Sequence, residues 1–296
     1  MAKLGDAYRS PYCNRITSLY EPLLERDQMI ICYLLAPIGS IGSMMYKSES
    51  GTETIKINFE SFHPSQFVAS NGVDAFVDVL NFEEKKKGTK NHHRTGCSCQ
   101  YAVKKIDTVD LIFIPVLLSD HFWCLCFHLK NGEIELIDNS RFKESFSKRY
   151  RGRPEMLSSS SIPERQDTTK RMDNKLGRTS IIRKEMDWRT LQNGVYCVFT
   201  MRHMETYKGK SPWNPRFVNE DKKTIQDSQL RFLRYRYLSK SVLSDYNLIR
   251  KEVYDKAKEF AKTARPVDVL NNLDNKVRDR LDQFFKLEKV KKNATS

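Results

Sequence analysis

The stretch DLIFIPVLLSDHFWCLCFHLKNGEIELIDNS, residues 110–140, decides the fold. It contains three apolar runs rich in isoleucine, phenylalanine and valine, at residues 111–118, 122–129 and 133–137. Asn131-Gly132 separates the last two runs, and this dipeptide is the strongest short-range signal for a β-hairpin. The three runs therefore predict the centre of a β-sheet and the most buried part of the chain.

Helical patterns flank this sheet region. Upstream, Val73–Phe82 spaces its apolar residues as one face of a helix does. Downstream of Gly194 the same spacing predicts helices at residues 198–207, 229–238, 244–264 and 267–285. A chain that runs from sheet to helices, without alternating between them, is typical of the α+β class.

The first 58 residues combine turn signals with short apolar runs. Thr54–Phe59 alternates apolar and polar residues, which is typical of a strand with one buried face. Residues 29–37 form an apolar run of strand length. We therefore expect an N-terminal extension with short strands over residues 1–58.

Composition excludes several classes of protein. The chain has 296 residues, a formal net charge of 51 − 37 = +14, and 39% hydrophobic residues, enough for a core. No apolar run approaches the roughly 18–20 residues of a membrane span, and no apolar stretch follows the N-terminus as in a secretory signal. Seven cysteines without regular spacing favour reduced thiols over a disulfide scaffold. We expect a soluble intracellular protein of the nucleus or cytoplasm, with no membrane partner.

Residues 141–180 break the pattern of the sheet. They contain the run SSSS at 158–161, an excess of basic residues and few large apolar side chains. This composition predicts a basic, flexible insertion.

Three residues of catalytic type lie at the ends of these elements. His121 opens a buried strand and Asp138 ends the strand paired with it, so the hairpin should bring them together. Cys197 follows a glycine-containing turn and opens a helix, where unpaired amides and the helix dipole favour a thiolate. The order predicts a nucleophilic Cys197, a basic His121 and an orienting Asp138. Singly, each residue is more typical of a structural role.

Gln192 lies five residues before Cys197. Its side-chain amide is the candidate donor to an oxyanion that develops during acyl transfer.

Two segments resemble a known family. IFIPVLLSDHFWCLCFHLKNGEIELIDNS, residues 112–140, and MDWRTLQNGVYCVFTMRHMETY, residues 186–207, are similar to ubiquitin-like-protein (SUMO, sentrin) specific proteases. The similarity is greatest to divergent plant members, many of them associated with transposable elements. FESFHPSQFVASNGVDAFVDVLNFEE, residues 59–84, also resembles the segment that these members carry upstream of the sheet.

The resemblance covers about residues 59–209 and implies a papain-like or adenain-like cysteine peptidase fold. The expected architecture is a central, mostly antiparallel sheet with flanking helices. The implied enzyme cuts after the Gly-Gly terminus of a SUMO-type modifier or its conjugates, through a thioester on Cys197, with His121 and Asp138 completing the triad. It implies no cofactor and no metal, and we expect a monomer.

The resemblance also implies two substrate-binding residues. Phe76 stands where close relatives have a tryptophan that resembles the family's clamp on the Gly-Gly tail. Trp123 follows the histidine motif and is assigned to the same surface.

The chain departs from the family around the nucleophile. The family has Asp-Cys-Gly where this chain has Tyr196-Cys197-Val198. Alignment from Trp188 keeps Cys197 in the nucleophile position and is the one we prefer, whereas alignment backwards from Phe199 puts Tyr196 there. The oxyanion glutamine of the wider family lies six residues before the cysteine, where this chain has leucine. The alternative function is therefore a catalytically impaired pseudoprotease that binds a ubiquitin-like modifier or another partner.

The predicted domain organisation follows from these limits. Residues 1–58 form the extension with short strands, residues 59–209 the catalytic domain with the insertion at 141–180, and residues 210–296 a C-terminal helical extension.

Two further patterns point to other ligands. His92-His93 and Cys97-x-Cys99 could bind zinc, but the second cysteine pair of a structural zinc site is missing. The lysine runs at residues 85–87 and 289–292 could serve nuclear import or contact phosphate backbones. Nucleic acid is thus a conceivable partner that no recognition motif supports.

Overall fold

The computed structural model describes residues 16–64, 66–87, 92–95, 109–118, 121–141, 145–160, 180–190, 194–210, 212–264 and 279–281. The chain divides into two compact units. The first comprises residues 1–79 and 231–296, and the second comprises residues 80–230. Helices α3 (Ser70–Lys87) and α8 (Lys223–Leu243) each contain a boundary between the units.

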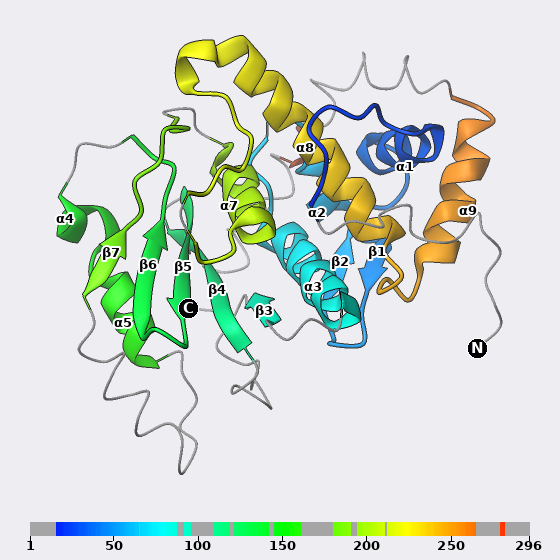
Figure 1. The fold of residues 1–296 in the computed structure, drawn as a ribbon. Coiled ribbons are helices and arrows are strands. Elements are labelled where there is room, and N and C mark those ends of the chain that lie inside the picture. The colour runs from blue at the N-terminus through cyan, green and yellow to red at the C-terminus, as the bar shows by residue number, and fades with distance from the viewer. Residues whose placement is uncertain are drawn as a thin grey trace, which may run out of the picture. The chain divides into compact units, whose positions relative to one another are not determined.

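The second unit contains a five-stranded sheet in the order β3-β4-β5-β6-β7 (Figure 1). Its strands are β3 (His92–Thr95), β4 (Val109–Leu118), β5 (His121–His128), β6 (Glu133–Ile137) and β7 (Ile181–Arg183). The three predicted strands are thus present as β4, β5 and β6, which pair antiparallel. Both short edge strands pair parallel, so the sheet is mixed, while its longer central ladders are antiparallel as the sequence predicted. Strand direction at an edge depends on the path of the connection, which composition does not report.

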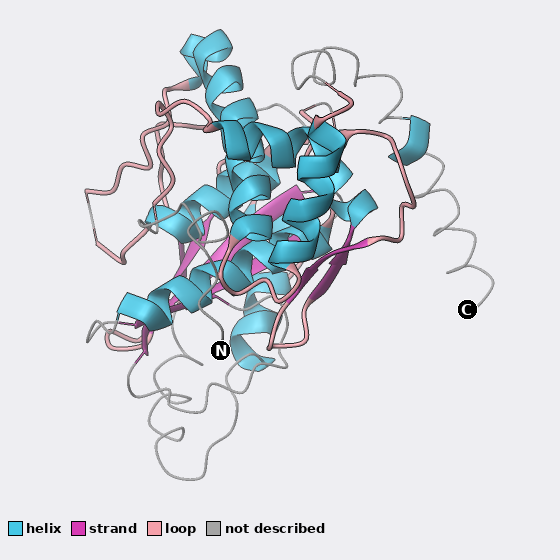
Figure 2. Ribbon diagram, turned by 90° about the vertical axis from the view of Figure 1, so that its right-hand side faces the viewer, coloured by secondary structure: helices cyan, strands magenta, loops and turns pink. Residues whose placement is uncertain are grey.

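The two faces of this sheet differ. One hydrophobic core contains odd-numbered residues of β5 and even-numbered residues of β6, together with Val109 of β4, Leu129 and Tyr150. The residues from β5 and β6 are Trp123, Leu125, Phe127, Ile134 and Leu136. Tyr150 comes from α4 (Phe146–Tyr150), and α5 (Arg153–Ser160) follows it. Helix α7 (Tyr196–Thr206) lies against β5 (Figure 1). Figure 2 shows the helices gathered beside the strands, without regular alternation of strand and helix along the chain. This arrangement is typical of the α+β class.

The insertion predicted at residues 141–180 is partly helical, because α4 and α5 lie within it. Phe146 and Tyr150 are four residues apart and pack ring against ring, with centroids 4.9 Å apart. One helical turn therefore presents two aromatic rings to the core, and the ring of Trp123 lies 5.2 Å from that of Tyr150. Residues 146–150 and 153–160 are thus helical where the sequence showed no helical pattern, and residues 161–179 lie outside the described part. The flexibility of the insertion stays a prediction.

The first unit is built from α1 (Glu25–Leu35), β1 (Met44–Lys47), β2 (Glu53–Ile55), α2 (Lys56–Glu60) and α9 (Arg250–Ala261), with parts of α3 and α8. Strands β1 and β2 form an antiparallel pair. Two predictions fail in this unit: residues 29–37 lie mostly in helix α1, and the strand predicted at Thr54–Phe59 ends at Ile55, where α2 begins. All five residues of α2 are buried. Alternation over six residues cannot exclude a short helix that is buried on every side.

A short helix η3 (Glu220–Lys222) precedes α8. The helix predicted at Val73–Phe82 is present as the longer α3. The limits of the catalytic domain at residues 59 and 209 stay a prediction. Among the described residues, the helices are too short or too polar for any of them to span a bilayer.

Candidate active site

The hairpin of β5 and β6 brings His121 and Asp138 together. Nε2 of His121 lies 3.0 Å from Oδ1 of Asp138. His121 is the first residue of β5 and Asp138 directly follows β6, so the antiparallel pairing positions both at one end of the two strands. Because Asp138 engages Nε2, Nδ1 is the nitrogen that can take a proton from a nucleophile.

Asp138 is held by three donors. Besides His121, the hydroxyl of Tyr150 donates to Oδ2 at 2.7 Å, and the amide of Ser140 donates to Oδ1 at 2.8 Å. Burial by itself raises the pKa of Asp138, but the hydrogen bonds from His121, Tyr150 and Ser140 outweigh it and keep the pKa below its usual value. The carboxylate is thus ionised at neutral pH and fixes the orientation of the His121 ring.

Tyr150 is a site residue that the sequence did not reveal. It lies in α4, inside the segment that was predicted to be flexible. The available signal was the aromatic pair Phe146 and Tyr150 at a spacing of four, one helical turn. Its burial and its bond to the Asp138 carboxylate both raise the pKa of the Tyr150 hydroxyl, so it stays protonated and acts as a donor.

Cys197 is the second residue of helix α7, whose N-cap is Val195. Its Sγ contacts the carbonyl oxygen of Gly194 at 3.8 Å, within the turn that precedes the helix. Gly194 has a φ of 81°, a conformation that favours glycine, so the sharp turn before the helix has a local cause. Cys197 is 3% exposed.

Tyr196 is the residue that packs its ring against His121. The two ring centroids are 4.2 Å apart and the ring planes meet at 74°, an edge-to-face contact. Tyr196 is the first residue of α7, directly before Cys197, and it is 3% exposed. Burial raises the pKa of its hydroxyl. This is the arrangement expected from the alignment that puts Tyr196 in the nucleophile position.

The remaining predicted site residues lie elsewhere. Trp123 is 1% exposed and belongs to the core beside Tyr150. Phe76, on α3, is fully buried and its ring lies 4.4 Å from that of Tyr237. Neither side chain presents surface to a substrate in this structure. Gln192 lies outside the described residues.

Possible metal ligands occur at two places. Cys97 and Cys99 of the zinc pattern lie outside the described residues. Within the described part, one group of metal-ligating side chains lies close together: Cys126, His128 and Glu135. These three residues come from β5 and β6, the same two strands that position His121 and Asp138.

Comparison with known proteins identifies the fold. No family model matches the sequence, and no curated protein matches it. Among solved structures, the chain is similar to the C-terminal Ulp1 protease domain in complex with Smt3, the yeast orthologue of SUMO, with 14% identity and a TM-score of 0.53. The match covers 76% of this chain and 100% of that domain. The Ulp1-like SUMO protease catalytic domain of Chaetomium thermophilum matches with 13% identity and a TM-score of 0.48, over 76% of this chain and 91% of that one.

The yeast structure, with the higher TM-score, carries the assignment. At this level of identity the likeness concerns the fold. The chain has the α+β, papain-like fold of a SUMO protease catalytic domain.

Proposed function

We propose that this chain is a ubiquitin-like-modifier-binding domain with a SUMO-protease fold, in which peptide hydrolysis through Cys197 is strongly impaired. The observation that carries the proposal is the 4.2 Å contact between the rings of Tyr196 and His121. A catalytic thiol must lie close to the imidazole, because its proton must reach a ring nitrogen across one hydrogen bond. In this chain a phenol ring packs against the imidazole.

The beginning of α7 makes an exchange of Tyr196 for Cys197 costly. Consecutive residues of an α-helix point about 100° apart around the axis. The amides of Val198 and Phe199 donate to the carbonyl of Val195, and every residue of the helix is buried. A rotation of this first turn that brought Cys197 to the position of Tyr196 would strain these hydrogen bonds and displace a buried aromatic ring.

Tyr196 cannot replace the thiol in the reaction. An unperturbed phenol has a pKa of about 10, and burial raises the pKa of Tyr196 further. The hydroxyl therefore stays protonated at neutral pH and is a weak nucleophile. Positioned acid–base catalysis contributes about 10²–10⁴-fold in enzymes. We expect hydrolysis by Cys197 to be reduced by a factor of this order or more.

The binding part of the proposal rests on the fold and the motif resemblance. The similar yeast domain is in complex with a SUMO orthologue, and the motifs around His121 and Cys197 resemble those of proteases that recognise a Gly-Gly tail. Because Trp123 and Phe76 are buried, they would contribute by supporting the surface around the tail. Gln192 remains the proposed oxyanion donor.

A second candidate function is an active cysteine peptidase that uses Cys197, His121 and Asp138 as a triad. It is favoured by the complete environment of the His121–Asp138 pair, in which Tyr150 and Ser140 also donate to the carboxylate. In this case Sγ of Cys197 must come within hydrogen-bond distance of Nδ1 of His121 in the presence of substrate.

Covalent labelling separates the two candidates. The protein is incubated with a SUMO-type modifier that carries a vinyl sulfone at its Gly-Gly end, and labelling is measured by intact mass. We expect no labelling of the wild type and labelling of the double variant Tyr196→Cys with Cys197→Gly, which returns a thiol to the place against His121. The matched control is Tyr196→Ser with Cys197→Gly, which has no thiol there. Labelling of the wild type that is lost in Cys197→Ala would establish the active peptidase instead.

Binding is tested separately, by calorimetry with the unmodified modifier. We expect the wild type and Cys197→Ala to bind a modifier ending in Gly-Gly with similar affinity, and to bind a version that lacks these two residues more weakly. Absence of binding to both forms would refute the proposed partner, whatever the labelling result.

A further inference from the structure

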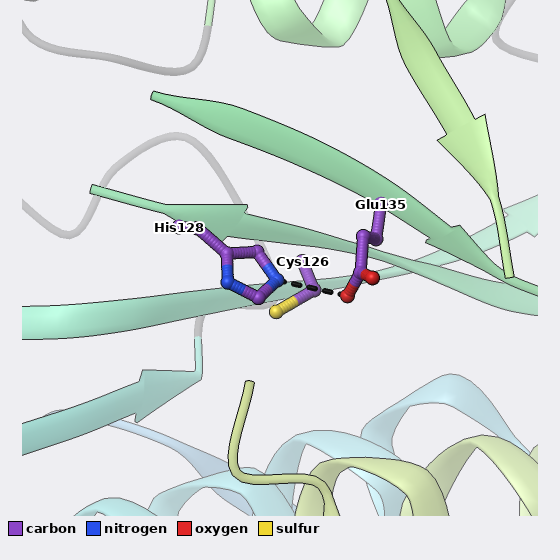
Figure 3. Close-up of side chains that lie close together, drawn as sticks. All are labelled: Cys126, His128 and Glu135. Carbon is purple, nitrogen blue, oxygen red and sulfur yellow. Dashed lines mark hydrogen bonds and ion pairs between the residues drawn. The ribbon is translucent and has the colours of Figure 1, made fainter. Parts of the chain in front are cut away.

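Three potential metal ligands meet on one face of the sheet. The ligand atoms of Cys126, His128 and Glu135 all lie within 4.8 Å of one another. Nε2 of His128 lies 2.8 Å from Oε2 of Glu135. The sulfur of Cys126 points into the space beside this contact (Figure 3). Cys126 and His128 are buried and Glu135 is partly buried.

Strand geometry explains why the three side chains converge. Cys126 and His128 are two residues apart on β5, so they point to the same face. Glu135 is the direct partner of Cys126 across the β5–β6 ladder and shares that face. The cluster therefore depends on the regular part of the sheet and on no loop.

We propose that Cys126, His128 and Glu135 form a binding site for Zn²⁺. Thiolate, imidazole and carboxylate are the three side-chain ligands that proteins use for this ion. Zinc–ligand bonds of about 2.0–2.3 Å put tetrahedral ligand atoms about 3.3–3.8 Å apart. The separations in the cluster need only side-chain adjustments to reach these values, with His128 giving up its contact with Glu135 to the metal. A water molecule would complete the coordination.

The surroundings of Glu135 suit a metal-bound carboxylate. Nζ of Lys184 lies 3.1 Å from Oε1, and the hydroxyl of Tyr207 donates to Oε2. Carboxylate ligands of metals are usually held by such outer hydrogen bonds. The charges of a thiolate and a carboxylate balance those of one Zn²⁺, and Lys184 adds a single positive charge beside Glu135.

Binding involves release of one proton. Burial, followed by the nearby Cys124 and Glu135, raises the pKa of Cys126 well above its usual value, so the metal-free thiol is protonated. When the zinc–sulfur bond forms, the sulfur–hydrogen bond breaks and the proton passes to solvent. No oxidation or reduction takes place.

The expected consequence is a clamp between two strands. The metal would join β5 to β6, the strands whose other ends position His121 and Asp138. Because a ligand that binds only the folded state stabilises it, Zn²⁺ should raise the melting temperature and a chelator should reverse the rise.

The experiment uses Co²⁺ as a spectroscopic substitute for Zn²⁺ in the full chain carrying Cys197→Ala, so that the thiol of Cys197 cannot contribute. We expect a thiolate-to-cobalt absorption band in the near ultraviolet that saturates at one equivalent. The band should disappear in Cys126→Ala and persist in Cys124→Ala, a matched control because Cys124 is also buried on β5, two residues away. No band, or a band that survives Cys126→Ala, would overturn the proposal.

X-ray absorption at the zinc edge keeps the proposal testable if Cys126→Ala does not fold. In the Cys197→Ala protein loaded with one equivalent of Zn²⁺, we expect one sulfur ligand and otherwise nitrogen or oxygen. Two sulfur ligands would assign the metal to Cys97 and Cys99, and none would exclude Cys126; either result refutes the site. Since Cys197 is absent from these samples, the outcome is independent of the proposed function.

Discussion

The two ends of the β5–β6 hairpin have the same combination of groups and different surroundings. At one end His121 contacts Asp138, and Tyr150 donates to the same carboxylate. At the other end His128 contacts Glu135, and Tyr207 donates to it. Each end is thus a histidine–carboxylate pair on the same two strands, with a tyrosine added from α4 or from the end of α7.

What differs is the group that stands beside the histidine. The ring of Tyr196 packs against His121, whereas the thiol of Cys126 lies beside His128 and Glu135. A histidine–carboxylate pair therefore does not define a catalytic site. The neighbouring side chain decides whether the pair can serve as a base, as a metal ligand set or as a buried polar contact.

The largest expected effect is the loss of either carboxylate. Asp138→Ala leaves His121, Tyr150 and the Ser140 amide without their shared acceptor in a fully buried position, and should lower the free energy of unfolding by about 3–5 kcal/mol. Glu135→Ala should cost about half as much, because its side chain is 16% exposed and water can replace part of its contacts. Urea unfolding monitored by circular dichroism measures both. Equal losses would show that burial does not distinguish the two ends.

Removal of the two tyrosine hydroxyls gives a smaller test of the same difference. Tyr150→Phe deletes a donor to a buried charge and should cost about 2 kcal/mol, whereas Tyr207→Phe should cost about 1 kcal/mol. Both substitutions keep the ring and its packing. Unfolding by urea with matched slopes is the measurement, and a larger loss in Tyr207→Phe would contradict the ranking.

Acid should weaken the Asp138 end. The folded-state pKa of Asp138 is below its ordinary value of 3.8, so its charge contributes stability that is complete above about pH 4 and is lost as the pH falls through the folded-state pKa. The difference in unfolding free energy between the wild type and Asp138→Asn should therefore be constant from about pH 7 to about pH 5, and should shrink below about pH 4. A difference that does not change down to about pH 3 would mean that the carboxylate is not the group responsible.

The smallest effect is expected away from the hairpin. Lys251 and Asp255 form a solvent-exposed pair on α9, 2.8 Å apart and one helical turn from each other. Lys251→Ala should change the free energy of unfolding by less than about 0.5 kcal/mol, because water already stabilises both charges. A loss of unfolding free energy similar to that of Tyr150→Phe would contradict this prediction. It would mean that the losses measured at the hairpin do not report the buried hydrogen bonds alone.

Much of the sheet was predictable from local pattern. The three apolar runs and the Asn131-Gly132 turn predicted β4, β5 and β6, and the hairpin explained why His121 lies near Asp138. Tyr150 could not be predicted, because its role depends on α4 folding back against Trp123. Residues 29–37 and 56–59 were wrongly expected to be strands. A short segment that is buried on every side shows no polar face, so its hydrophobic pattern cannot distinguish a helix from a strand.

The sequence by itself determined the order of the elements, the pairing that joins His121 to Asp138, and the presence of a thiol at the beginning of a helix. These follow from contacts between near neighbours, whose spacing is written in the chain. Only the tertiary structure decided that the ring of Tyr196 packs against His121, and that Cys126 shares a sheet face with His128 and Glu135. A single residue turns a helix by about 100° and reverses the face of a strand, so the direction of one side chain depends on how its element packs.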